Sequence, residues 1–172
     1  LIHWLSPKDE VPVAEYMTAL VNAQDQGLTQ EIGVSNFTIA HLRQAIVAVG
    51  AGRITNQQIE IHPFLQNKRV VAFCQENQIP VTAYMPLAYG KVMHDPVLQK
   101  IADKHATTPA LISLAWLLQQ GFTVIPSSTK REHLANNLKA ADITLSDEEM
   151  SAIAKLDINE RIANPDFSPN WD

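Results

Sequence analysis

The chain has 172 residues, is 46% hydrophobic and carries 18 acidic against 13 basic residues, for a formal net charge of −5. Because no run of Lys or Arg interrupts this mixture, we expect neither a nucleic-acid partner nor an anionic membrane. One cysteine, Cys74, cannot form an internal disulfide, and no apolar stretch reaches the roughly 18 residues of a membrane span, so the sequence indicates a reducing, cytoplasmic location.

The chain opens on an apolar run over residues 1–5, with neither an initiating Met nor a charged leader, so we expect this sequence to lack its beginning. Short apolar or β-branched runs then recur, most of them separated by stretches of helical period. This alternation is typical of βα units around a parallel sheet. The strands expected from these runs lie at residues 1–4, 31–35, 54–61, 79–84 and 122–125.

Helices are expected between the strands because apolar side chains recur there at helical spacing. The first helix has its apolar face from Val13 to Val21, and Gly27 follows where a left-handed cap belongs. The second begins after Thr38 as its N-cap and closes at Gly50. A third is expected over residues 67–78.

The later helices carry clearer start signals. Asp95-Pro96 and Thr108-Pro109 each pair an N-cap residue with Pro at the first helical position. Another helix begins near Arg131, and residues 146–149 form a capping box for the last one. The tail over residues 159–172 has no period and is expected to be a loop. Five strands are too few to close a barrel of eight.

The strand ends carry a recognisable set of motifs. These are LIHW at residues 1–4, IGVSNF at 32–37, QQIEIHP at 57–63, AYMPL at 83–87 and IPSS at 125–128. In this order and spacing they resemble strands four to eight of the aldo-keto reductases, above all the bacterial 2,5-diketo-D-gluconate reductase B group. The resemblance implies an α/β fold, the (β/α)₈ TIM barrel, in which residues 1–172 are the C-terminal part of a single barrel domain. It also implies a monomer at full length.

The resemblance assigns the first strand ends to the substrate and to the nicotinamide end of a cofactor. His3 resembles the active-site histidine that orients the carbonyl, and Trp4 resembles a residue of the substrate pocket. The residues similar to those that hydrogen-bond the nicotinamide carboxamide are Ser35, Asn36 and Gln58. Tyr84 resembles the aromatic residue on which the nicotinamide ring stacks. In barrels of this kind, active sites lie at the C-terminal ends of the strands, which agrees with these positions.

The resemblance also assigns residues to the rest of the cofactor. Met85 stands where relatives commonly have Ser beside the pyrophosphate, and Leu87 follows on the same loop. The loop that resembles the site of the adenosine phosphate consists of Ser127, Ser128, Thr129 and Lys130. His133 stands where NADPH-selective relatives commonly have Arg, and Asn136 and Asn137 resemble the adenine contacts. The cofactor expected is therefore NADPH, with NADH possible.

Each of these residues also has a simpler interpretation when it is taken alone. A histidine at a strand end often only makes hydrogen bonds to neighbouring groups of the protein, and Ser35-Asn36 could merely make a turn. Tyr84 could be an ordinary core tyrosine, and the helix near Arg131 a plain surface helix. Glu60 is expected to be structural or ion-paired, and Cys74 a small buried residue. The histidines and Cys74 lack metal-ligand spacing, so we expect no bound metal.

The function implied is reduction of small aldehydes and ketones, with keto-sugar acids such as 2,5-diketo-gluconate and methylglyoxal-like dicarbonyls as substrates. The acid tyrosine of the family, with its lysine and aspartate partners, lies upstream of the strand that bears His3, so the chain alone is expected to be inactive. One alternative is a cofactor-binding regulatory module with little turnover. A further alternative is an unrelated phosphate-binding barrel that shares only the last loop.

Overall fold

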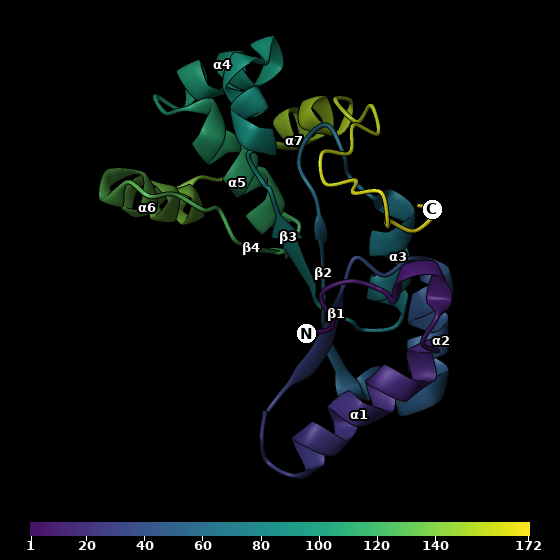
Figure 1. Cartoon of the computed structure of the whole chain (residues 1–172). Helices are drawn as coiled ribbons and strands as arrows, with labels where there is room; N and C mark the ends of the chain where they lie inside the picture. Colours follow the sequence, from purple (N-terminus) through teal and green to yellow (C-terminus); the bar gives the residue numbers. More distant parts are fainter. The chain divides into compact units, whose positions relative to one another are not determined.

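The computed structural model describes the backbone of residues 1–172 and every side chain except that of Asp9. Four strands are hydrogen-bonded in chain order, and β1 and β2 run parallel (Figure 1). They are β1 (Ile32–Ser35), β2 (Ile54–Glu60), β3 (Val81–Tyr84) and β4 (Thr123–Val124). The α-helices are α1 (Val13–Asp25), α2 (Ile39–Val49), α3 (Lys68–Glu76), α4 (Pro96–Lys104), α5 (Pro109–Gln119), α6 (Arg131–Leu138) and α7 (Asp147–Ala154).

The prediction of a strand over residues 1–4 is wrong. These residues make a single isolated bridge, between Ile2 and Val34. The Ile2 N–H donates to the Gly33 carbonyl at 3.1 Å, and the Ser35 N–H donates to the Ile2 carbonyl at 2.8 Å. The chain bends at Trp4, immediately after this bridge, so the ladder cannot extend. The bridge nevertheless places His3 beside the end of β1.

The helix ends follow the signals in the sequence. The Thr38 hydroxyl accepts from the His41 N–H, and Gly50 ends α2 at φ +86°. Asp95 accepts from the N–H groups of residues 97 and 98, at 2.9 and 3.0 Å, ahead of Pro96. Ser146 and Glu149 complete the predicted capping box of α7. The predicted helices are confirmed, and at α2, α4, α5 and α7 a side-chain cap satisfies backbone groups that have no partner within the helix.

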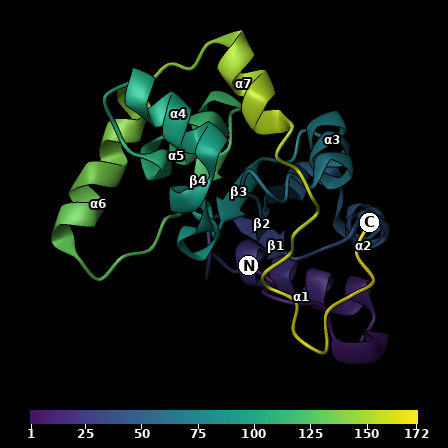
Figure 2. The ribbon, with the colours of Figure 1, turned by 90° about the horizontal axis from the view of Figure 1, so that it is seen from above.

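The chain divides into two compact units. Unit 1 comprises residues 1–59, 67–82 and 163–172, and unit 2 comprises residues 60–66 and 83–162. In unit 1, α1 and α2 pack side by side (Figure 1), and Met17 on α1 and Leu42 on α2 are fully buried. In unit 2, α5 is buried along most of its length and packs against α4 (Figure 2). The assignment of residues 1–172 to one domain stays a prediction.

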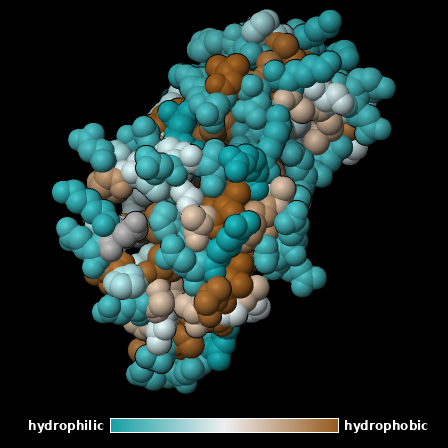
Figure 3. All heavy atoms as spheres, turned by 90° about the vertical axis from the view of Figure 1, so that its right-hand side faces the viewer, coloured by the Kyte–Doolittle hydropathy of each residue, from teal (hydrophilic) through white to brown (hydrophobic). Residues whose placement is uncertain are grey.

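Surface and core both follow the sequence pattern. On the face drawn in Figure 3, hydrophobic residues lie between hydrophilic ones, which is normal for a protein surface.

Cys74 is fully buried on α3, as predicted, and burial raises the pKa of its thiol to about 12. None of the described helices combines the length and apolar character that a membrane crossing requires.

An irregularity in unit 1 sets the register of the strand ends. Ile32 pairs with Ile54 but Val34 pairs with Gln57, so β2 contains one more residue than β1 over this stretch. A Cβ atom on Gly33 would lie 2.7 Å from the Asn56 carbonyl oxygen, closer than side chains tolerate. Glycine therefore permits this close approach, and the shifted register pairs Ser35 with Gln58.

Unit 2 contains an ion pair that should make its stability depend on pH. His105 Nε2 lies 2.9 Å from Glu149 Oε2, and Lys104 Nζ lies 3.5 Å from Glu149 Oε1. The hydrogen bond from His105 lowers the pKa of Glu149, and it outweighs the opposing effect of burial. A carboxyl group with a lowered pKa stabilises the fold above its unfolded pKa, and this contribution is lost as the pH falls through its folded pKa.

We expect Glu149→Gln to weaken this pH dependence. The variant retains a side chain that can complete the capping box but cannot ionise. Its free energy of unfolding should therefore fall less than that of the parent protein as the pH is lowered below about 5. Urea denaturation at a series of pH values measures this difference. Equal pH dependence in the two proteins would show that Glu149 contributes nothing to it.

Candidate functional site

The predicted residues of unit 1 come together at the ends of neighbouring backbone segments. The Ser35 hydroxyl donates to the Gln58 carbonyl at 2.8 Å, and the Asn36 N–H donates to the same carbonyl at 3.0 Å. Asn36 Nδ2 donates to the His3 carbonyl at 3.0 Å and to Ser35 Oγ at 3.2 Å. Asn36 is left-handed, at φ +61°, a conformation that Asn tolerates better than most residues. Ser35 therefore ends β1, the chain bends at Asn36, and the two residues link the segments that carry His3 and Gln58.

These contacts divide the polar side chains into two kinds. Ser35 and Asn36 are both 1% exposed, and their hydroxyl and amide groups already hold the neighbouring backbone. The Gln58 side chain is half-buried and has no hydrogen-bond partner among the described residues. An amide in that position can donate to and accept from a carboxamide at once. Of these three side chains, Gln58 is thus the one whose amide makes no hydrogen bond to a described residue.

His3 and Trp4 stand next to an aromatic cluster that the sequence interpretation missed. The Trp4 ring lies edge-on to Phe167 and Trp171, with ring centroids 5.4 and 6.2 Å apart. Trp171 Nε1 donates to Asn164 Oδ1 at 2.8 Å, which fixes the indole. The His3 ring is exposed, and no described residue hydrogen-bonds to it. It is therefore available to a ligand in this structure.

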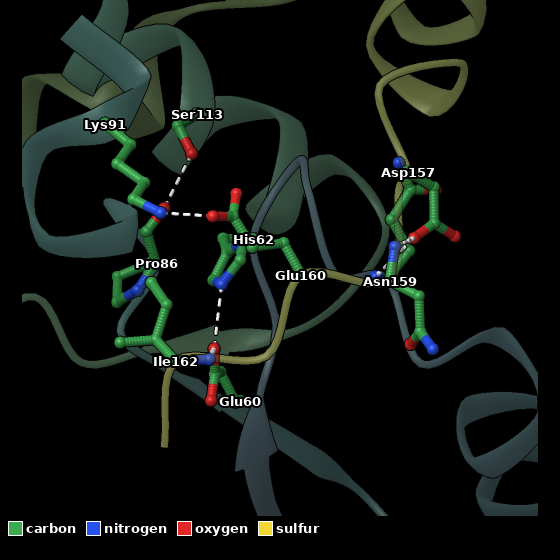
Figure 4. Close-up of polar contacts among 10 residues, drawn as sticks. Glu60, His62, Pro86, Lys91, Ser113, Asp157, Asn159, Glu160 and Ile162 are labelled. Carbon is green, nitrogen blue, oxygen red and sulfur yellow. Dashed lines mark hydrogen bonds and ion pairs between the residues drawn. The ribbon is translucent and has the colours of Figure 1, made fainter. Parts of the chain in front are cut away.

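In unit 2, β3 ends in a sharp change of backbone direction. Tyr84 is half-buried, and Met85 follows it at φ +50°. The Pro86 carbonyl accepts from the Ser113 hydroxyl at 2.7 Å, which fastens this turn to α5 (Figure 4). Burial raises the pKa of Tyr84, the charge of Glu60 raises it further, and Arg161 opposes both. The phenol consequently stays protonated at neutral pH, so the side chain carries no charge there.

A buried carboxylate lies close to that ring. Glu60 Oε1 accepts from His62 Nε2 at 2.9 Å and from the Ile162 N–H at 2.7 Å (Figure 4). The side chains of Glu60 and His62 are fully buried. Lys91 pairs with Glu160 two residues before Ile162. The prediction that Glu60 is structural or ion-paired is confirmed by these contacts. They join the end of β2 to the segment that follows α7.

Most of the residues predicted for the adenosine end of the cofactor line a cavity of about 660 Å³. The predicted residues that line it are Leu87, Ser127, Ser128, His133, Asn136 and Asn137. Thr129 and Lys130 lie on the same loop but do not line it, and the Lys130 N–H donates to Ser128 Oγ at 3.1 Å. The volume falls in the range of small-molecule and cofactor sites.

Two charged residues of this cavity were missed by sequence reasoning. Glu132 and Lys139 both belong to its lining, and Lys139 Nζ donates to Asn136 Oδ1 at 2.9 Å. The signal for them was helical spacing, since Glu132, Asn136 and Lys139 recur three or four residues apart across α6 and its end. Among the described residues, no group of three or more His, Cys, Asp and Glu side chains could hold a metal ion.

Comparisons with known proteins agree with this geometry. The family model described as aldo/keto reductase family matches residues 1–158. The methylglyoxal reductase DkgB of Escherichia coli O157:H7 is 53% identical over 173 residues, which cover 100% of this chain and 65% of that protein. The methylglyoxal reductase DkgA of Escherichia coli (strain K12) is 36% identical over 169 residues, which cover 96% of this chain and 61% of that protein. The chain thus spans about two thirds of the length of these relatives.

Solved structures show the same fold. A mutant of Gox0644 in complex with NADPH matches with a TM-score of 0.89 at 36% identity, over 95% of this chain and 60% of that chain. MGS-M4, an aldo-keto reductase from a deep-sea metagenome library, matches with a TM-score of 0.88 at 29% identity, over 99% of this chain and 63% of that one. The predicted α/β fold, part of a (β/α)₈ barrel, is confirmed. The chain belongs to the aldo/keto reductase family.

Proposed function

We propose that the chain is the larger part of an NADPH-dependent reductase that converts small aldehydes and ketones to alcohols. The proposed substrates are methylglyoxal-like dicarbonyls and keto-sugar acids such as 2,5-diketo-gluconate, and the proposed state of the full enzyme is a monomer. The observation that carries the proposal is the cavity of unit 2, which brings Ser127, Ser128, His133, Asn136 and Asn137 together. The names of the relatives and the NADPH complex of one structural neighbour support it.

Each group of residues has a role in this proposal. The cavity of unit 2 holds the adenosine phosphate, with the N–H groups at the start of α6 favouring an anion. The Gln58 amide orients the carboxamide, and the neutral Tyr84 ring offers its face to the nicotinamide. The bound cofactor supplies the hydride. His3 hydrogen-bonds the carbonyl oxygen and assists its protonation, and Trp4 forms a wall of the substrate pocket.

The test uses a completed enzyme, in which the N-terminal part of Escherichia coli O157:H7 DkgB that this chain does not match precedes Leu1. We expect this chimaera to oxidise NADPH when methylglyoxal is added, and residues 1–172 alone to give no turnover because the family's acid tyrosine is outside them. The loss of nicotinamide absorbance measures both. NADPH binding without any carbonyl reduction would instead favour a regulatory module.

A further inference from the structure

We propose that Glu132 is a specificity-determining residue that accepts a hydrogen bond from the ribose 2′-hydroxyl of NADH and repels the 2′-phosphate of NADPH. This inference rests on the proposed function, because it concerns the cofactor of that same cavity. It predicts an enzyme that uses both cofactors, with Glu132 working against NADPH.

The position of Glu132 supports this role. It is the second residue of α6 and lines the cavity together with Ser127, Ser128 and His133. Glu132 therefore borders the same cavity as the two serines that would face the adenosine ribose. In Rossmann-type dinucleotide sites a carboxylate accepts from the ribose 2′-hydroxyl of NADH, whereas a nearby arginine accommodates a 2′-phosphate, and the same chemistry applies to a carboxylate in this cavity.

The charges of the cavity support the same role. Among the described lining residues, the fixed charges are the carboxylate of Glu132 and the ammonium of Lys139, and Lys139 already donates to Asn136. Lys130 and Arg131 flank the cavity without lining it. The lining therefore offers a 2′-phosphate no surplus of positive charge. Because Glu132 is exposed, its repulsion of a phosphate acts through solvent and should weaken as the salt concentration rises.

A simpler role for Glu132 is to stabilise α6, since an acidic residue in the first turn is favourable for any helix. The chain provides a matched control for that role. Glu148 is the second residue of α7, in the same helical position, and does not line this cavity. A purely helix-stabilising effect should appear equally in Glu148→Gln and leave cofactor selection unchanged.

The experiment compares Glu132→Gln, Glu132→Lys and Glu148→Gln in the completed enzyme. Calorimetric titrations give the dissociation constants of NADPH, NADH, adenosine 2′,5′-bisphosphate and 5′-AMP at low and high salt. We expect Glu132→Gln to shift the NADPH-to-NADH affinity ratio about fivefold toward NADPH at low salt, and less at high salt. Glu132→Lys should shift this affinity ratio further toward NADPH. The affinity for adenosine 2′,5′-bisphosphate should rise in both variants as the affinity for NADPH does.

Different outcomes separate the two proposals. If the unmodified completed enzyme binds neither cofactor, the proposed function fails and this inference fails with it. If both cofactors bind but neither Glu132 variant changes their ratio, the inference alone is overturned. A change of the same size in Glu148→Gln would also overturn it, because that residue lies outside the cavity.

Discussion

Replacing His3 with alanine in the completed enzyme should lower kcat by about 10²-fold or more while the dissociation constant for NADPH stays within a few-fold. The His3 ring is exposed and makes no hydrogen bond to a described residue, so its removal should leave the fold intact. The loss should appear in turnover because an imidazole beside the end of β1 would act on the carbonyl oxygen. Steady-state kinetics and fluorescence titration of NADPH measure the two quantities separately.

Two further variants make this result interpretable. Tyr84→Ala should first weaken NADPH binding, because it removes the proposed stacking surface. His94→Ala, at another exposed histidine, should change neither quantity. Unchanged turnover in His3→Ala, or a loss confined to cofactor affinity, would remove His3 from the proton-handling role.

Glu60→Ala should lower the free energy of unfolding by about 3–5 kcal/mol. The substitution leaves the buried His62 ring N–H and the partly buried Ile162 N–H without their shared acceptor. Glu60→Gln keeps a carbonyl oxygen at the same distance along the side chain and should cost less. Urea denaturation measures the stability, and hydrogen exchange at the Ile162 amide locates the loss.

The neighbouring ion pair provides the control for this prediction. Glu160 pairs with Lys91 at the surface, where the two side chains are 34% and 52% exposed. Glu160→Ala should therefore cost at most about 1 kcal/mol, because water and salt screen such pairs. If Glu60→Ala were no more destabilising than Glu160→Ala, the buried contacts of Glu60 would not stabilise the fold as argued.

The local elements could be predicted because their signals lie within a few residues. Thr38, Asp95 and Ser146 each satisfy backbone groups of the helix that immediately follows, so their effect is readable without tertiary information. The strand predicted over residues 1–4 does not form, because strand pairing depends on residues far away in the chain. The apolar pattern of these residues suits a strand, but only Ile2 makes a ladder contact before the chain bends at Trp4.

Only the site residues that lie within the family motifs could be predicted from the sequence. The pairing of Ser35 with Gln58 depends on an extra residue in β2 and on the close approach at Gly33, which no local pattern reveals. Phe167 and Trp171 contact Trp4 from more than 160 residues away in the chain, within a tail that has no period. Glu132 belongs to the cavity because of how α6 is placed, and spacing alone gives no placement.

Burial of the single cysteine has a consequence for how samples of this protein should be interpreted. Cys74 is fully buried, and its raised pKa keeps the sulfur as a thiol, which is a poor nucleophile. Folded molecules therefore cannot exchange with oxidised glutathione or cross-link to one another. Any covalent dimer on a non-reducing gel must come from molecules in which α3 has opened, so its amount records the history of unfolding in the sample.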